Sequence, residues 1–364
     1  MLTRTSFADK ITGLPILSVG CEGRDTAHNY FTAMTWLSNS RHLIVQTDID
    51  REKLTGSIVR FDTDTGDVQV LEEDLTWGRG VVSCDDILYL FDKNELYAID
   101  AWSGERRTIC KLEEHCTFFG PLSITNDGKV LGVYWKEQLH PPEDASSREA
   151  NWVIGTVHTE SGEVCVAARP LFEEPYPVAN HAMVNPVDPN HVFFSHEGAT
   201  EQIPDRLWVV DTRTGDMRNL FSQKREESGR PVEYVGHEIW AFDGSGLYFV
   251  KYPHSPDKPT GVFFVDKQGE WSEFVNGDYN YWHVGISPDG WYAVADTQEP
   301  GISKIVLIDM ATKRSKLLCE LPCRGVHPGH PHPSFSPDNR KITFTFSDEH
   351  DVLWVGIMDI SDCK

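Results

Sequence analysis

The amino-acid sequence predicts an all-β fold, a seven-bladed β-propeller that takes in the whole chain, residues 1–364, as one domain. Short β-rich segments, each directly after a polar turn, recur at the spacing of about 40 to 60 residues that one four-stranded blade requires. In addition, no segment of about 12 or more residues has the apolar periodicity of an amphipathic helix.

The repeated unit is a strand, a turn, a second strand and a further turn of the type Asp-x-x-Thr/Ser-Gly. Its first strand occurs at residues 42–46, 87–91, 130–135, 191–194, 247–251, 291–295 and 341–346. Seven similar units without linkers favour closure into a ring over stacked sandwiches, because closure removes exposed sheet edges. Residues 13–20 are expected to close the last blade as an outer strand. The polar segments 138–150 and 222–231 are expected to be loop insertions in the third and fourth blades.

Composition and charge disfavour several classes of protein. The chain has 33 basic and 56 acidic residues, a formal charge of −23, which disfavours general binding to nucleic acid or to an anionic membrane. It has no apolar run of about 18 residues and no secretory signal pattern, so we expect a cytoplasmic protein. The eight cysteines are scattered without a CxxC pair, which argues for free thiols rather than a zinc ribbon or a disulfide framework.

Histidines recur at one position of the repeat. When the blades are aligned on their turns, His181, His237, His283 and His332 each stand six residues before the same turn position in the last four blades. The first three blades have Ala33, Arg79 and Pro121 there. Equivalent positions next to the central channel converge around the axis, so the four imidazoles are expected to face one another at one channel end.

The most specific local string runs from His327 to Pro333 and contains His330 and His332. Its prolines exclude a helix, so the segment is extended, and His330 and His332 then point to one side. Two neighbouring imidazoles suit a divalent ion such as Zn²⁺, Mn²⁺, Fe²⁺ or Ni²⁺, and the ligand types alone do not choose among them.

These motifs resemble a known family, the oligogalacturonate lyases, which are β-propeller polysaccharide lyases of bacterial pectin breakdown. The resemblance covers most of the chain. It is carried by Tyr30 to Thr32, Ser195 to Gly198, Asp205 to Trp208, Gly236 to Trp240, His283 to Asp289 and His330 to Asp338.

The resemblance implies a β-elimination on a small anionic oligosaccharide, an oligogalacturonide, by a monomer or homodimer. It implies a divalent cofactor, Mn²⁺, with His283, His327, His330 and His332 as ligands. His327 stands where the family has glutamine, which keeps a ligand but changes its type. The family's base corresponds to His237.

The family's assisting arginine corresponds to Arg206, which could bind a carboxylate with both nitrogens of its fork. His181 and His196 are expected near the site, where they would orient a ligand or bind sugar hydroxyls. Trp240 and Tyr281 are candidates for stacking on a sugar ring, although core packing explains each of them equally well.

The chemistry suits these residues without the family name. Removal of the proton at C5 of a uronate is difficult while the adjacent carboxylate is ionised, and a divalent cation on that carboxylate eases it. A neutral imidazole such as His237 is a suitable base at pH 7.

Other functions remain open from the residues. One is a metal-dependent enzyme for another uronate or sugar, and another is a non-catalytic scaffold, which gives no reason for the ring of histidines. A glycoside hydrolase would need paired carboxylates, for which Glu197, Asp205 and Glu238 are available. A serine hydrolase is disfavoured because the sequence has no G-x-S-x-G elbow.

Overall fold

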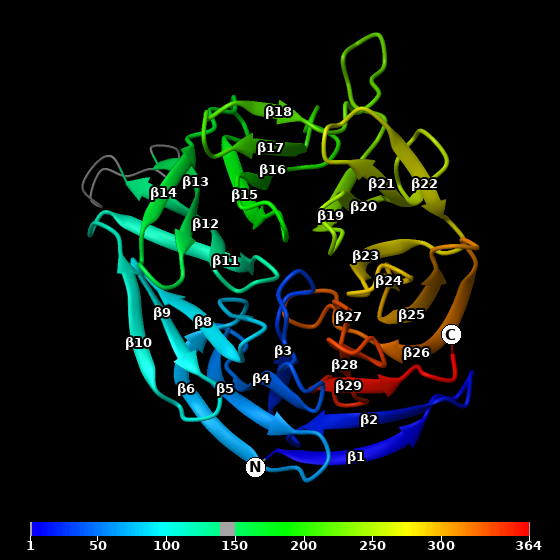
Figure 1. Cartoon of the computed structure of the whole chain (residues 1–364). Coiled ribbons are helices and arrows are strands. Elements are labelled where there is room, and N and C mark those ends of the chain that lie inside the picture. The colour runs from blue at the N-terminus through cyan, green and yellow to red at the C-terminus, as the bar shows by residue number, and fades with distance from the viewer. Residues whose placement is uncertain (1, 139–149, 364) are drawn as a thin grey trace.

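Seven antiparallel sheets are arranged around one central axis in the computed structural model, which describes residues 2–138 and 150–363 (Figure 1). The predicted seven-bladed β-propeller is therefore confirmed. The described residues contain strands, turns and bends but no helix, and hence no helix long and apolar enough to cross a membrane.

The first three blades are four-stranded and follow the order of the chain. Blade one contains β3 (Asp25–His28), β4 (His42–Ile49), β5 (Thr55–Asp62) and β6 (Val68–Thr76). Blade two contains β7 (Val81–Val82), β8 (Ile87–Asp92), β9 (Glu95–Asp100) and β10 (Arg106–Lys111). Blade three contains β11 (Cys116–Ile124), β12 (Val130–Gln138), β13 (Ala150–His158) and β14 (Val164–Ala168).

The next three blades repeat this arrangement. Blade four contains β15 (Val178–Val184), β16 (His191–Glu197), β17 (Leu207–Asp211) and β18 (Met217–Asn219). Blade five contains β19 (Val235–Trp240), β20 (Gly246–Lys251), β21 (Gly261–Asp266) and β22 (Ser272–Asn276). Blade six contains β23 (Tyr281–Ile286), β24 (Tyr292–Thr297), β25 (Ile302–Asp309) and β26 (Ser315–Pro322).

The seventh blade joins the two ends of the chain. Its sheet has the order β1 (Thr3–Ala8), β2 (Pro15–Gly20), β29 (Leu353–Asp359), β28 (Lys341–Ser347) and β27 (Ser334–Phe335). In Figure 1 the blue strands β1 and β2 lie outside the red strand β29. The register Leu17↔Ile357 and Val19↔Val355 pairs β2, near the start of the chain, with β29, the last strand.

The middle strands of each blade are buried because their sequences are β-branched and aromatic on both faces. Val192, Phe193 and Phe194 of β16, for example, have no exposed surface. Burial of an apolar side chain of this size stabilises the fold by about 1.5–3 kcal/mol. Neighbouring blades approach closely at Gly132, where an added Cβ would lie 2.5 Å from the backbone nitrogen of Val184.

The seven predicted first strands correspond to the second strands of the blades, β4, β8, β12, β16, β20, β24 and β28. Segment 222–231 lies between β18 and β19 and forms an isolated bridge between Arg225 and Pro231. Of the other expected insertion, residues 139–149 lie outside the described residues.

The innermost strands of blades four, five and six are irregular where the register histidines stand. The pairing shifts between Asn180 and Met183 in β15 and between Gly236 and Ile239 in β19, and an equivalent shift occurs in β23. A bulge of this kind inserts an extra residue and redirects its side chain. His181 and His237 have φ angles of 53° and 55°, a conformation that non-glycine residues adopt at a cost on the order of 1 kcal/mol.

Candidate metal and catalytic site

Five histidines from blades five, six and seven form one cluster at one end of the channel. The ring centres of His237 and His283 lie 4.0 Å apart, and those of His283 and His332 lie 4.4 Å apart. His330 lies 5.6 Å from His283, and His327 lies 4.6 Å from His330. The structure therefore brings together residues that are up to 95 positions apart in the sequence.

Three of these histidines have the geometry of metal ligands. His283, His330 and His332 each offer a ring nitrogen, and these ligand atoms lie within 4.8 Å of one another. His283 Nε2, His332 Nε2 and His330 Nδ1 are buried, and among the described residues they have no hydrogen-bond partner. Because a buried nitrogen without a partner is costly, a divalent cation at their meeting point fits this donor set.

Asp296 orients the innermost of the three ligands. Its carboxylate accepts the Nδ1 hydrogen of His283, at 2.8 and 3.0 Å from its two oxygens, and both residues are fully buried. It also accepts the backbone N–H groups of His283 and His332. Because Nδ1 of His283 donates, Nε2 is left with its lone pair, the arrangement that second-shell carboxylates create for metal-binding histidines. Burial raises the pKa of Asp296 to about 7.

The cluster keeps its imidazoles neutral. Burial, and then the neighbouring histidines, hold the pKa values of His283 and His332 well below the usual range. For the same reasons the pKa of His327 falls to about 4. The neutral imidazole is the form that binds metals or accepts a proton.

His237 is held in the tautomer that a base requires. Its Nδ1 lies 2.5 Å from the backbone carbonyl of Trp282, and since a carbonyl only accepts, Nδ1 must carry the hydrogen. Nε2 is then free to accept a proton. Burial, with the charges of His283 and Arg206, lowers the pKa of His237 well below its usual value.

Arg206 is buried in a cluster with two glutamates. Nη1 and Nη2 donate to the two carboxylate oxygens of Glu197 at 2.9 and 3.0 Å, and Nε donates to Glu238 at 2.6 Å. Burial raises the pKa of Glu197, but Arg206 outweighs it and brings the value to about 2. The fork that we expected to be available for a substrate is therefore bound to Glu197 in this structure. A carboxylate held ionised in this way is also unsuited to be the general acid of a glycoside hydrolase.

Among the other expected substrate contacts, His181 lies with the cluster, with its ring 5.6 Å from that of Tyr30. His196 differs from expectation, because it stacks on Phe172 at 3.8 Å and bonds to the carbonyl of Tyr176. These contacts hold the ring of His196 within its own blade.

The two expected stacking aromatics are also core residues, which corrects their assignment to substrate binding. Tyr281 has no exposed surface, and its hydroxyl donates to Asn276 at 2.6 Å. The indole of Trp240 is buried and donates to the carbonyl of Met183 at 3.0 Å. Tyr281 is enclosed by protein, and Trp240 borders only the uncharged pocket at the other end of the channel, away from the histidine cluster.

Blade one contributes residues that the histidine alignment missed. Nε2 of His28 lies 3.0 Å from the carbonyl of Pro331, between the ligands His330 and His332, and burial lowers the pKa of His28 to about 4. Blade one was aligned on Ala33, five residues further along, so the alignment gave no signal for His28. Its position at the end of β3 becomes informative only once blade seven is placed beside blade one.

Aromatic rings cover the cluster from the same side. Tyr30 contacts the rings of His181, His283, His327 and His332, at centre distances between 4.7 and 6.4 Å. Trp77, directly after β6 of blade one, stacks on His327 and His332. The loop after β3, dark blue in Figure 1, enters the centre of the ring and carries Tyr30.

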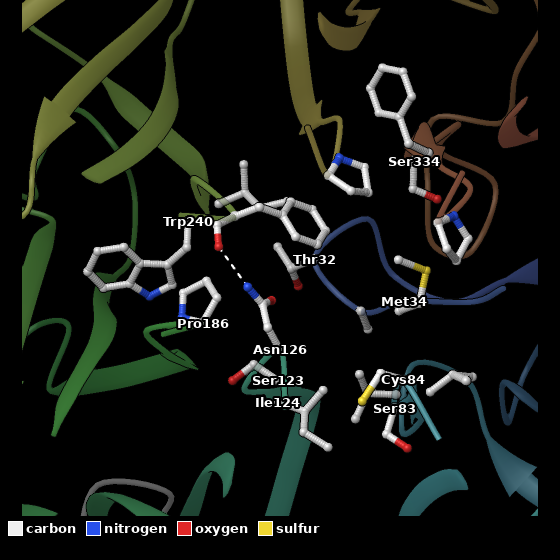
Figure 2. Close-up of a pocket in the computed structure, with 18 of the residues that line it drawn as sticks. Thr32, Met34, Ser83, Cys84, Ser123, Ile124, Asn126, Pro186, Trp240 and Ser334 are labelled. Carbon is white, nitrogen blue, oxygen red and sulfur yellow. Dashed lines mark hydrogen bonds between the residues drawn. The ribbon is translucent and has the colours of Figure 1, made fainter. Parts of the chain in front are cut away.

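The opposite part of the channel is different (Figure 2). A pocket of about 350 Å³ begins two residues beyond the register histidines, at Met183, Ile239, Gly285 and Ser334. It is lined mainly by apolar side chains such as Met34 and Trp240, and none of its described lining residues is charged. In Figure 2 the dashed line joins the amide of Asn126 to the carbonyl of Phe242, at 2.8 Å.

The fold and the site together define a class of protein: a seven-bladed β-propeller with a histidine-rich site for a divalent cation at one end of its channel. No family model matches the chain. An oligogalacturonide lyase of Pectobacterium atrosepticum is 26% identical over 303 residues, 75% of this chain and 74% of that protein. An oligogalacturonate lyase of Dickeya dadantii is 24% identical over 372 residues, 93% of this chain and 92% of that protein.

Solved structures agree in fold. An oligogalacturonate lyase in complex with manganese superimposes with a TM-score of 0.82 at 21% identity, over 98% of this chain and 96% of its own. The Vibrio parahaemolyticus oligogalacturonate lyase also gives 0.82 at 21% identity, over 100% of this chain and 98% of its own. The chain is thus related to the oligogalacturonate lyases, and the family resemblance predicted from its motifs is confirmed.

Proposed function

We propose that this protein is a metal-dependent lyase that cleaves short oligogalacturonides by β-elimination. The observation that carries the proposal is a juxtaposition. Three histidines with convergent ring nitrogens lie beside His237, whose tautomer leaves Nε2 free. A cation site next to a neutral base is what proton removal beside a carboxylate requires.

His283, His330 and His332 would hold the cation, which we propose to be Mn²⁺, and the ring of His327 lies beside that of His330. When bound, the cation neutralises the uronate carboxylate and stabilises the negative charge that develops beside it. Asp296 fixes the direction of His283 and so the place of the site.

His237 Nε2 would accept the C5 proton. The electron pair of the C5–H bond then forms a double bond between C4 and C5, and the bond from C4 to the glycosidic oxygen breaks. That oxygen takes a proton from solvent water, and His237 later returns its own proton to solvent. The ring of Phe31 packs against His237 and His283 and limits the access of water. A neutral His237 is available throughout the physiological pH range, because its pKa lies below it.

The substrate is proposed to enter at the histidine end. Arg206, with its buried positive charge, lies close enough to affect the pKa values of His181 and His237. The uncharged pocket at the other end offers nothing to a polyanionic sugar, since burying an unpaired carboxylate there would be costly.

The purified protein with oligogalacturonate should release a product with a new double bond, seen as rising ultraviolet absorbance, and a chelator should abolish the rise. His237→Ala should lower kcat by about 10²- to 10⁴-fold, the usual contribution of a general base. His350→Ala, at a side chain that is 77% exposed, is the matched control and should be active. A hydrolytic product without a double bond would contradict the lyase assignment.

A further inference from the structure

We propose that Glu197 is a displaceable internal ligand of Arg206, occupying the fork that a uronate carboxylate of the substrate takes when it binds. The inference rests on the proposed function and deepens it, because it assigns the selection of carboxylate-bearing sugars to one exchange of partners. Glu197 is then a specificity-determining residue rather than a catalytic one.

The two glutamates on Arg206 are not equivalent. The side chain of Glu238 is 2% exposed and accepts from Nε, whereas that of Glu197 is 32% exposed and accepts from both terminal nitrogens. A bidentate carboxylate on the end of a guanidinium is the geometry in which arginine recognises carboxylate ligands. Glu197 therefore holds the recognition position and is also the partner with a way out to solvent.

The guanidinium itself is fixed. The backbone N–H of Arg206 donates to Gln223 at 2.9 Å, and its carbonyl accepts from the backbone N–H of His196 at 2.9 Å. Glu238, which holds Nε, also accepts a hydrogen bond from Ser195 at 3.3 Å. With backbone and Nε both held, loss of Glu197 would leave the fork in place and pointing in the same direction.

Charge makes the exchange selective. Glu197 is ionised, since its pKa is about 2, so the group of Arg206, Glu197 and Glu238 has a net charge of −1. A uronate that replaces Glu197 restores the same charge and the same two hydrogen bonds. A neutral sugar cannot do so: Glu238 would still balance the charge of Arg206, but the two terminal nitrogens would lose their charge-assisted hydrogen bonds to a carboxylate.

The exchange would take place beside the proposed base. The carboxylate of Glu197 lies close enough to influence the pKa of His181, and His181 and His237 lie close enough to influence that of Glu197. A carboxylate accepted on the fork would therefore lie near His237. One uronate of a chain would then anchor the sugar while a neighbouring one meets the cation.

The test is the affinity of the Mn²⁺-loaded protein for D-galacturonate, measured by calorimetry. This sugar acid has no glycosidic bond to eliminate, so binding is read without turnover. Glu197→Gln removes the competing charge and should tighten the dissociation constant about threefold or more, the value of one partly exposed ion pair. Neutral D-galactose should gain nothing.

The matched control is Glu137→Gln. Glu137 of blade three, outside the site, also accepts two hydrogen bonds from one arginine, from Nε and Nη2 of Arg169 at 2.9 and 2.7 Å. Its loss should leave galacturonate affinity unchanged. An unchanged or weaker affinity in Glu197→Gln would overturn the proposal. Should that variant fail to fold, Glu197→Asp, whose shorter side chain cannot keep both bonds, should also bind more tightly.

The outcome is separable from that of the proposed function. Absence of an unsaturated product would refute the lyase activity while a tighter galacturonate complex of Glu197→Gln would still support the exchange. Conversely, a lyase whose Glu197→Gln variant binds galacturonate no better would retain its function and lose this account of its specificity.

Discussion

At one end of the central channel the innermost strands present histidines, and two residues further along the same strands they present Met183, Ile239, Gly285 and Ser334. The two ends differ in backbone as well as in chemistry. The pairing is interrupted at the histidines and regular again beyond them, as in Met183↔Phe193 and Val184↔Val192. The bulges lower the stability of the fold and redirect side chains. The regularly paired part of each strand, in contrast, only packs against its neighbouring strands.

One strand can therefore present a functional histidine at one point and line an uncharged pocket at another. Up to the bulge, the strand directs a histidine into the channel, as at His283, whose Nε2 has no hydrogen-bond partner among the described residues. Past the bulge, the same strand lines an uncharged pocket. Variants at the two ends should therefore separate cation binding from stability.

The largest effect is expected for a ligand. His332→Ala should weaken Mn²⁺ binding by at least about 100-fold, the upper end of what loss of an outer partner alone produces. Ser334→Ala, two residues away in the pocket, is the control and should change the affinity little. Equal losses in the two variants, measured by metal titration, would contradict the division of the channel.

A somewhat smaller effect is expected for Asp296. Asp296→Asn keeps the shape but removes the charge that orients His283, and it should weaken Mn²⁺ binding about 10- to 100-fold. Asp309→Asn, at an exposed turn of the same blade, should leave the affinity unchanged. An Asp296→Asn variant with the metal affinity of the wild type would show that His283 needs no such support.

Acid should destabilise the metal-free protein through the histidine end. His28 has a pKa of about 4 when folded and about 6.5 when unfolded, so the unfolded chain binds the proton first as the pH falls. Stability is therefore complete above pH 6.5 and declines toward pH 4, and His28 alone should cost about 2 kcal/mol at pH 5. Denaturant unfolding of wild type and His28→Gln at pH 7 and pH 5 measures it, and an identical pH dependence in both would refute this contribution.

The smallest effect is expected at the apolar end. Trp240→Phe removes the hydrogen bond to the Met183 carbonyl and should lower the free energy of unfolding by about 1 kcal/mol. The affinity for Mn²⁺ should not change, because the indole lies on the far side of the bulge. Loss of metal binding in this variant would show that the two ends are coupled.

Much of this architecture follows from local patterns. Turn and strand signals are short-range, so the seven units and most second strands could be predicted from the sequence. The alignment of His181, His237, His283 and His332 also needed no structure, because repeated units place equivalent residues at equivalent sites.

Other assignments depended on contacts that no local pattern encodes. Trp240 and Tyr281 could equally have faced a ligand or the core. Their hydrogen bonds to Met183 and Asn276 hold Tyr281 in the core and Trp240 at the uncharged pocket, both away from the histidine cluster. His28 was missed because its partner, the carbonyl of Pro331, lies 303 positions away.

The sequence by itself determined a ring of seven blades and a histidine-rich end to its channel, since both arise from repetition. Only the tertiary structure decided which nitrogens are free, that Asp296 holds His283 and that Glu197 occupies the fork of Arg206. The physical reason is that the strands of a blade pair with strands of the same repeat, so residues close together in the sequence determine that pairing. The state of a buried polar group, in contrast, is set by whichever distant residue closure of the ring places against it.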